Sequence, residues 1–136
     1  MMKNFYATLT ALLILLSPWA NATTLVGAWE LEYAIYKNNK GEVIAEIKDK
    51  STRSRKILSD HHFTFVTWDN TGKFIVAGSG TYTLENGTYT EVVDSTSEAR
   101  LMGKTYKFGF ALKEGIWIHK GMEDGTLIEE HWRKLP

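Results

Sequence analysis

The dipeptide Asn86-Gly87 constrains the fold of this chain more than any other part of the sequence. Asn-Gly favours a two-residue type I′ turn, because both central positions of that turn need a positive φ. The tetrapeptide Gly-Thr-Tyr-Thr occurs twice around it, beginning at Gly80 and again at Gly87. Alternating threonine and tyrosine are typical of a pleated strand with one buried face. We therefore predict a β-hairpin centred on Asn86-Gly87.

The register of this hairpin determines which side chains share a face. With this turn, Leu84 pairs with Tyr89. Two residues further from the turn, Tyr82 pairs with Glu91, and directly paired residues lie on the same side of a sheet. The aromatic side should face inward, because the opposite side carries threonines. The hairpin therefore brings the carboxylate of Glu91 into an aromatic interior, which is the first indication of a functional site.

Two further dipeptides, Glu114-Gly115 and Asp124-Gly125, predict hairpins nearer the C-terminus. The first turn places His119 opposite Phe110, and the second places His119 opposite Glu130. The two registers agree with each other, although each is derived from its own turn. Together they direct one set of side chains inward: Phe108, Phe110, Trp117, His119, Glu130 and Trp132.

The remaining strand candidates recur at short spacing with turn residues between them. They cover residues 25–36, 55–59, 62–68, 73–84 and 104–113. Residues 42–54 are mixed and charged, and fit a hairpin arm, a short helix or a mobile loop. With the predicted hairpins the count reaches about eight strands, and there is no helix long enough for a crossover. The sequence therefore predicts an all-β fold, an antiparallel up-and-down barrel whose closure removes the sheet edges.

Within the first predicted strand, strict alternation places one set of side chains on a common inward face: Trp29, Leu31, Tyr33 and Ile35. The basic residues Arg53, Arg55 and Lys56 are expected to form a solvated strand edge. The adjacent pair His61-His62 is expected on the surface, because neighbouring strand residues point to opposite faces and cannot share a metal ion.

The first 22 residues have the pattern of an export signal. Lys3 precedes an apolar run over residues 9–16, which is too short to span a membrane, and Ala20-Asn21-Ala22 matches a signal-peptidase site. We expect cleavage after Ala22 and a single mature domain, residues 23–136, in the periplasm or outside the cell, with no transmembrane segment.

The absence of cysteine excludes disulfide bonds, and the balance of charges argues against a nucleic-acid-binding protein. The 136-residue chain has no cysteine, 16 basic and 16 acidic residues; removal of residues 1–22 takes away only Lys3 and leaves 15 basic and 16 acidic. No excess of positive charge would attract nucleic acid.

At this point the chain resembles a family of small bacterial secreted lipocalin-like proteins of the calycin type. The resemblance rests on Gly27-Ala28-Trp29, which matches the G-x-W of that superfamily, on the segments 56–63, 80–91 and 130–134, and on a late basic residue. In lipocalins such a residue packs over the tryptophan. Here Arg133 or Lys134 occupies that place, and the predicted register favours Lys134. The resemblance implies a barrel and suggests that it binds a ligand.

The candidate ligand-binding residues are those expected to point into the barrel: Trp29, Tyr82, Tyr89, Glu91, Phe108, Phe110, Trp117, His119, Glu130 and Trp132. The His119–Glu130 pair fits a polar anchor, an acid–base couple or, by preference, a structural ion pair. Burying two carboxylates is costly unless they are paired, so the inward face fits either a pocket with polar groups or a filled interior in which the polar groups satisfy one another.

Three functions fit these residues. The first is an exported carrier of a small apolar or amphipathic molecule. The second is a barrel enzyme of the isomerase or hydrolase type that uses Glu91, His119 and Glu130, although no nucleophile constellation supports it. The third is a filled barrel that acts as an envelope or interaction domain. No cofactor or metal is expected; a haem variant of the carrier would have only His119 as an axial ligand.

Overall fold

The computed structural model describes residues 24–136, so the predicted export signal and the cleavage site after Ala22 lie outside the described residues. Nine strands and one 3-10 helix follow one another along this part of the chain: β1 Gly27–Lys37, β2 Val43–Ile47, β3 Thr52–Leu58, β4 His62–Asp69, β5 Phe74–Glu85, β6 Thr88–Thr96, η1 Ala99–Leu101, β7 Thr105–Lys113, β8 Ile116–Glu123 and β9 Thr126–Lys134. Within residues 24–136, no helix is long and apolar enough to cross a membrane.

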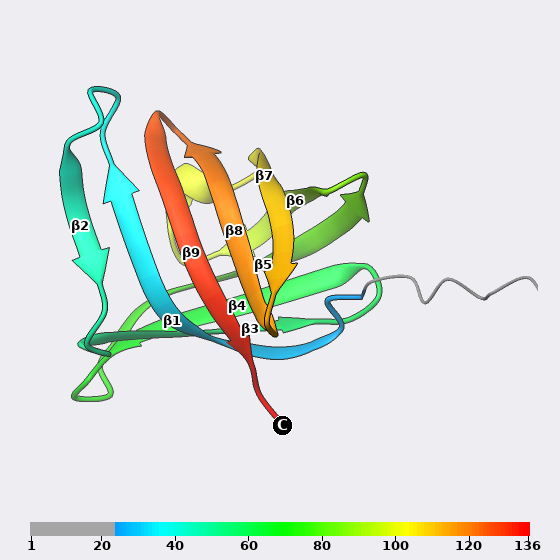
Figure 1. Ribbon diagram of the computed structural model, residues 1–136, viewed down its shortest axis with the longest axis horizontal. Coiled ribbons are helices and arrows are strands. Elements are labelled where there is room, and N and C mark those ends of the chain that lie inside the picture. The colour runs from blue at the N-terminus through cyan, green and yellow to red at the C-terminus, as the bar shows by residue number, and fades with distance from the viewer. Residues whose placement is uncertain (1–23) are drawn as a thin grey trace, which may run out of the picture.

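All strand pairs are antiparallel, and strands β3 to β9 lie beside one another in chain order. Strand β1 pairs with β9 along residues 29–37 and closes the sheet into a barrel of eight strands (Figure 1). The other edge of β1 is shared, because residues 27–30 pair with β3 and residues 34–37 pair with β2. The predicted all-β barrel is therefore confirmed, and the ambiguous segment 42–54 is a hairpin arm, β2, followed by the start of β3.

The three Xaa-Gly turns have the predicted conformation. Asn86 and Gly87 have φ values of 51° and 74°, and both residues of the other two turns also have positive φ. Every pairing predicted from these turns is observed, including Tyr82 with Glu91 and His119 with Glu130. The inward positions of the late strands follow from turns that can be recognised in the sequence.

The inward face predicted for the first strand is wrong beyond Leu31, because β1 contains a bulge there. Leu31 pairs with Trp132 and Tyr33 pairs with the preceding residue of β9, so Glu32 is an extra residue on β1. An extra residue reverses the alternation beyond it. Tyr33 and Ile35 therefore face outward, and Ala34 and Tyr36 take the inward positions.

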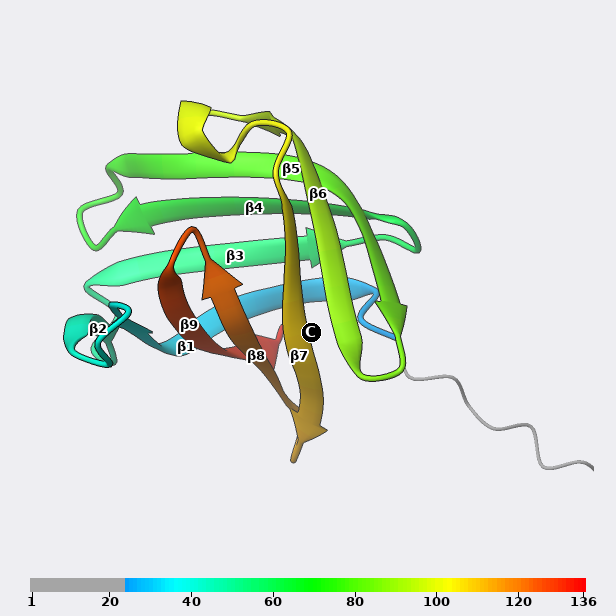
Figure 2. The same ribbon diagram turned by 90° about the horizontal axis from the view of Figure 1, so that it is seen from above.

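One end of the barrel is filled by an aromatic plug, defined here as Trp29, Phe63, Tyr82, Tyr89 and Trp117. All five are buried. Trp117 packs edge to face on Trp29 and on Tyr89, with centroids 5.6 Å and 5.3 Å apart, and Tyr82 stacks on Tyr89. Tyr82 and Tyr89 place the plug near the β5–β6 turn, because they lie within a few residues of it on the two paired strands. The 3-10 helix η1 and the β4–β5 turn lie at the opposite end of the barrel from that turn (Figure 2).

A basic side chain covers the plug from the C-terminal strand. The ammonium of Lys134 lies 5.6 Å from the centre of the Trp29 ring, a cation–π distance. Arg133 lies on the outside, where it pairs with Glu30 and Glu32. The basic residue over the tryptophan is thus Lys134, as the register predicted.

Candidate functional site

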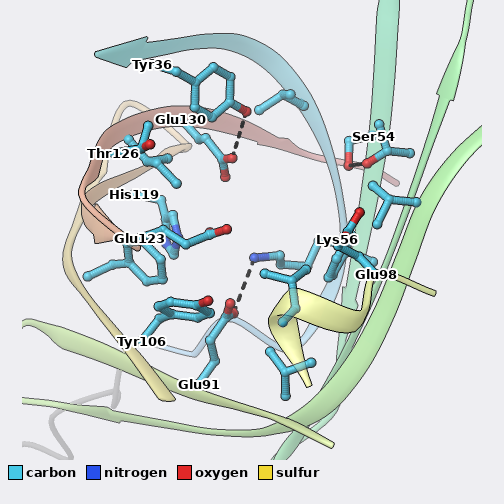
Figure 3. A pocket seen from close by; sticks show the side chains of 18 of the residues that line it. Tyr36, Ser54, Lys56, Glu91, Glu98, Tyr106, His119, Glu123, Thr126 and Glu130 are labelled. Atoms are coloured by element: carbon cyan, nitrogen blue, oxygen red, sulfur yellow. Dashed lines mark hydrogen bonds and ion pairs between the residues drawn. The ribbon is translucent and has the colours of Figure 1, made fainter. Parts of the chain in front are cut away.

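The end of the barrel opposite the plug is hollow. A cavity of about 650 Å³ extends inward from η1 and the β8–β9 turn, and every strand contributes to its wall (Figure 3). Its apolar surface includes five aromatic side chains: Tyr36, Phe65, Tyr106, Phe108 and Trp132. Five acidic residues and two basic residues also line it: Glu91, Glu98, Glu123, Asp124 and Glu130, with Lys56 and Arg100.

Lys56 lies inside the barrel, so the predicted solvated strand edge is wrong at this residue. Its alternation with Ser54 and Leu58, which are also buried, places it on the inner face of β3. The ammonium lies within 5.2–5.8 Å of the centres of four rings: Phe63, Tyr89, Trp117 and Trp132. These cation–π contacts offset part of the cost of burying the charge. Arg53 and Arg55 lie on the outer face, both over the ring of Trp68.

Glu91 is the acidic partner of Lys56. The two side chains are 3.6 Å apart, between Nζ and Oε2, and both are more than nine-tenths buried. Oε2 accepts no hydrogen bond within the described residues. The pair is therefore held by charge and leaves hydrogen-bonding capacity unused inside the barrel.

Glu130 points into the cavity from β9 and has uncharged hydrogen-bond donors. The hydroxyl of Tyr36 donates to Oε1 at 3.1 Å, and the indole N–H of Trp132 donates to Oε2 at 3.0 Å. Burial raises the pKa of the Glu130 carboxyl above its usual value, although the charge of Lys56 and the Tyr36 hydroxyl lower it. No Lys, Arg or His of residues 24–136 lies within ion-pair distance of this carboxyl.

The predicted His119–Glu130 ion pair is not formed, although the two residues are cross-strand partners. The His119 ring packs on Phe108 with centroids 3.8 Å apart, and no hydrogen bond reaches its Nδ1 within the described part of the chain. Burial, with a smaller effect of the Lys56 charge, lowers the pKa of His119 well below its usual value of 6.5. His119 is therefore a neutral imidazole on the cavity wall.

A second cluster of charged side chains lies at the mouth of the cavity, which is the open end beside η1 and the β8–β9 turn. Arg100, from η1, lies 3.1 Å from Glu123 and 3.4 Å from Asp124. The Tyr106 hydroxyl donates to Asp124 at 2.8 Å. Burial raises the pKa of Glu123, while its hydrogen bond from Arg100 opposes that rise. The mouth is thus more polar than the plug and keeps its charges near solvent.

Residues 24–136 match the family described as "Domain of unknown function (DUF4488)". The chain belongs to this DUF4488 family. No curated protein matches it. Among solved structures, a lipocalin-like protein from Bacteroides uniformis ATCC 8492 is similar, with 16% identity, a TM-score of 0.53 and coverage of 82% of this chain and 98% of that one. An uncharacterised protein from Bacteroides eggerthii DSM 20697 has 16% identity, a TM-score of 0.54 and coverage of 82% and 100%. These similarities establish the lipocalin-like fold of the DUF4488 chain.

The ten predicted ligand-binding residues of this DUF4488 protein divide between the two ends of the barrel. Five line the cavity: Glu91, Phe108, His119, Glu130 and Trp132. Four belong to the plug: Trp29, Tyr82, Tyr89 and Trp117. The tenth, Phe110, is partly buried against the core and belongs to neither group.

Sequence reasoning missed several cavity residues of this family member. Lys56 could have been found by counting back two positions from the apolar Leu58 on the same strand. Tyr36 was missed because the bulge in β1 reverses the alternation before it, and no glycine at the bulge indicates its position. Within residues 24–136, no three His, Asp or Glu side chains are grouped closely enough to hold a metal ion.

Proposed function

We propose that this DUF4488 protein is an exported binding protein that holds a small, partly apolar molecule in the hollow end of its barrel. The observation that carries the proposal is the cavity itself, with aromatic walls and a few convergent polar groups. Binding sites for small molecules commonly have volumes of about 300–1,000 Å³ and this mixture of surfaces.

The energetics of the polar groups support the same proposal. A buried polar atom without a partner costs about 1–3 kcal/mol. Within the described residues, neither Glu91 Oε2, which is held by its ion pair with Lys56, nor His119 Nδ1 accepts a hydrogen bond. Evolution tolerates this cost most readily where the groups serve a ligand, because an apolar core of the same size would be more stable. Export is proposed from the pattern of residues 1–22.

The proposal can be tested with N-phenyl-1-naphthylamine, a neutral dye whose fluorescence rises in an apolar site. Thr126 lies on the cavity wall and is half-buried, so Thr126→Trp should fill part of the cavity and weaken dye binding about tenfold or more. Thr83→Trp places the same side chain on the exposed face of β5 and serves as the control. Thermal unfolding of both variants establishes that they remain folded.

Equal dye affinity in the two variants would place the dye outside the cavity and would contradict the proposal. Failure of the wild-type protein to bind the dye, or any of a panel of small amphipathic molecules, would favour a barrel without a ligand. N-terminal sequencing of the exported protein tests the cleavage site, and the expected first residue is Thr23.

A further inference from the structure

The cavity has an excess of acidic groups, and the two basic groups are already paired. Lys56 is bound to Glu91, and Arg100 is bound to Glu123 and Asp124. Glu130 is left with hydrogen bonds from a phenol and an indole, neither of which carries a charge. Glu98 also lacks an ion-pair partner among the described residues, but it is exposed, so Glu130 is the unpaired carboxyl group inside the barrel.

His119, which is 2% exposed, lies on the same wall and has an unpartnered Nδ1. A neutral imidazole has one nitrogen that accepts a hydrogen bond. Since burial keeps His119 uncharged, it adds no positive charge to this wall that would repel a cation. Figure 3 shows Glu130 at the top of the cavity and His119 and Glu123 at its left, while the Lys56 ammonium reaches in from the right toward Glu91 at the bottom.

We propose that the bound molecule carries a positive charge, and that its ammonium group binds beside Glu130 with its apolar part against the aromatic wall. This proposal rests on the binding function proposed above and specifies the ligand class. A carboxylate in a site of low dielectric constant attracts a cation more strongly than it does in water. An organic amine fits better than a metal ion, because no three His, Asp or Glu side chains of residues 24–136 are grouped as metal ligands.

The apolar part of such a molecule has a defined surface to contact. Tyr106 and Phe108 stand on β7 and Trp132 stands on β9, and all three line the cavity. Aromatic rings contribute both buried apolar area and cation–π attraction to an ammonium group. The expected ligand class is therefore an amine with an aromatic or aliphatic body, and an anionic molecule of the same size is disfavoured.

The test compares three probes with the same body and different charge, 4-phenylbutylamine, 4-phenylbutanol and 4-phenylbutyrate, by isothermal titration calorimetry. We expect the amine to bind about tenfold more tightly than the alcohol, since a hydrogen bond to a charged group is stronger than one to a neutral group. The carboxylate should bind most weakly. Glu130→Gln should remove the preference for the amine over the alcohol, and continued binding of the alcohol would establish that the cavity is intact.

Glu129→Gln is the matched control, because Glu129 lies on the outer face of the same strand beside Lys120 and His131. It should leave all three affinities unchanged. Equal binding of the amine and the alcohol, or tighter binding of the carboxylate, would overturn the cationic ligand and leave the binding function standing. Binding of none of the three probes would overturn both proposals.

Discussion

Lys56 and Glu91 form an ion pair across the inside of the barrel, from β3 to β6, two strands that are not neighbours in the sheet. A second pair, Lys120 with Glu129, has the same separation of 3.6 Å and lies on the outside. The side chains of the inner pair are 6% and 9% exposed, and those of the outer pair are 57% and 31% exposed. The two pairs therefore differ in burial at equal distance.

The first prediction uses this difference. Lys56→Met should lower the free energy of unfolding by about 3 kcal/mol, because it leaves Glu91 buried without its cation. Lys120→Met should lower it by less than about 0.5 kcal/mol, since exposed pairs contribute little. Unfolding in urea measures both. Equal losses would mean that the inner pair is as well hydrated as the outer one.

The second prediction concerns two glycines on the central hairpin. A Cβ at Gly80 would lie 1.8 Å from the carbonyl oxygen of Val92, so Gly80→Ala requires a shift of the backbone. A Cβ at Gly87 would meet no atom within 4 Å, and the cost there comes only from the positive φ of 74°. We expect Gly87→Ala to cost about 1 kcal/mol and Gly80→Ala clearly more, or to prevent folding. The order of the two urea midpoints tests this, and the reverse order would contradict the hairpin geometry.

The third prediction is a dependence of stability on pH that His119 causes. The folded state holds this imidazole neutral, with a pKa well below 6.5, while the unfolded chain protonates it near 6.5. As the pH falls below about 6.5, the unfolded state takes up a proton that the folded state does not, so stability is lost, by up to about 1.4 kcal/mol per pH unit. Above that pH the effect is absent.

The His119→Gln variant has no imidazole at this position. Its free energy of unfolding should therefore rise relative to that of the wild type as the pH falls from 7.5 to 5.5. His62→Gln, on the exposed start of β4, provides the control and should follow the wild type. Urea unfolding at several pH values gives the measurement. A difference that stays constant with pH would argue that His119 is protonated in the folded protein.

The fourth prediction tests the hydrogen bond between Tyr36 and Glu130. The Tyr36 hydroxyl stabilises the ionised carboxylate, and burial has already raised the pKa of Glu130. Tyr36→Phe should raise that pKa further, because it removes one of the two donors to the charged form. Carbon NMR of the glutamate carboxyls, with Glu130→Gln used for assignment, follows the titration. A fall in the pKa would show that the hydroxyl favours the protonated carboxyl.

The barrel and the inward-facing residues of strands β5 to β9 were predictable, because three Xaa-Gly turns determine the pairing of these five strands. Once Asp124-Gly125 is a type I′ turn, the position of Glu130 opposite His119 follows without further information. Turn chemistry is local, and local signals survive in a single sequence. The inward positions of Tyr82, Tyr89 and Trp117 were predicted for the same reason, but these residues were expected to bind the ligand and instead belong to the plug.

The missing parts of the site depend on structure that the sequence does not mark. The bulge at Glu32 contains no glycine, and strict alternation across it assigns Tyr36 to the wrong face. Lys56 sits in a polar strand where apolar alternation is weak, and its burial is compensated by rings that come from four other strands. These cation–π contacts form only when the barrel closes, so the pairing of strands within one hairpin does not predict them.

The separation of the aromatic plug from the cavity has a consequence for adaptation. The side chains that hold the barrel closed, such as Trp29 and Trp117, are different from those that shape the hollow end, such as Thr126 and Thr67. Wall residues that do not contact the plug, such as these two threonines, can therefore be exchanged without loss of the aromatic contacts that stabilise the fold. A library randomised at wall positions should yield many folded variants with new preferences, which makes this barrel a starting point for engineered receptors.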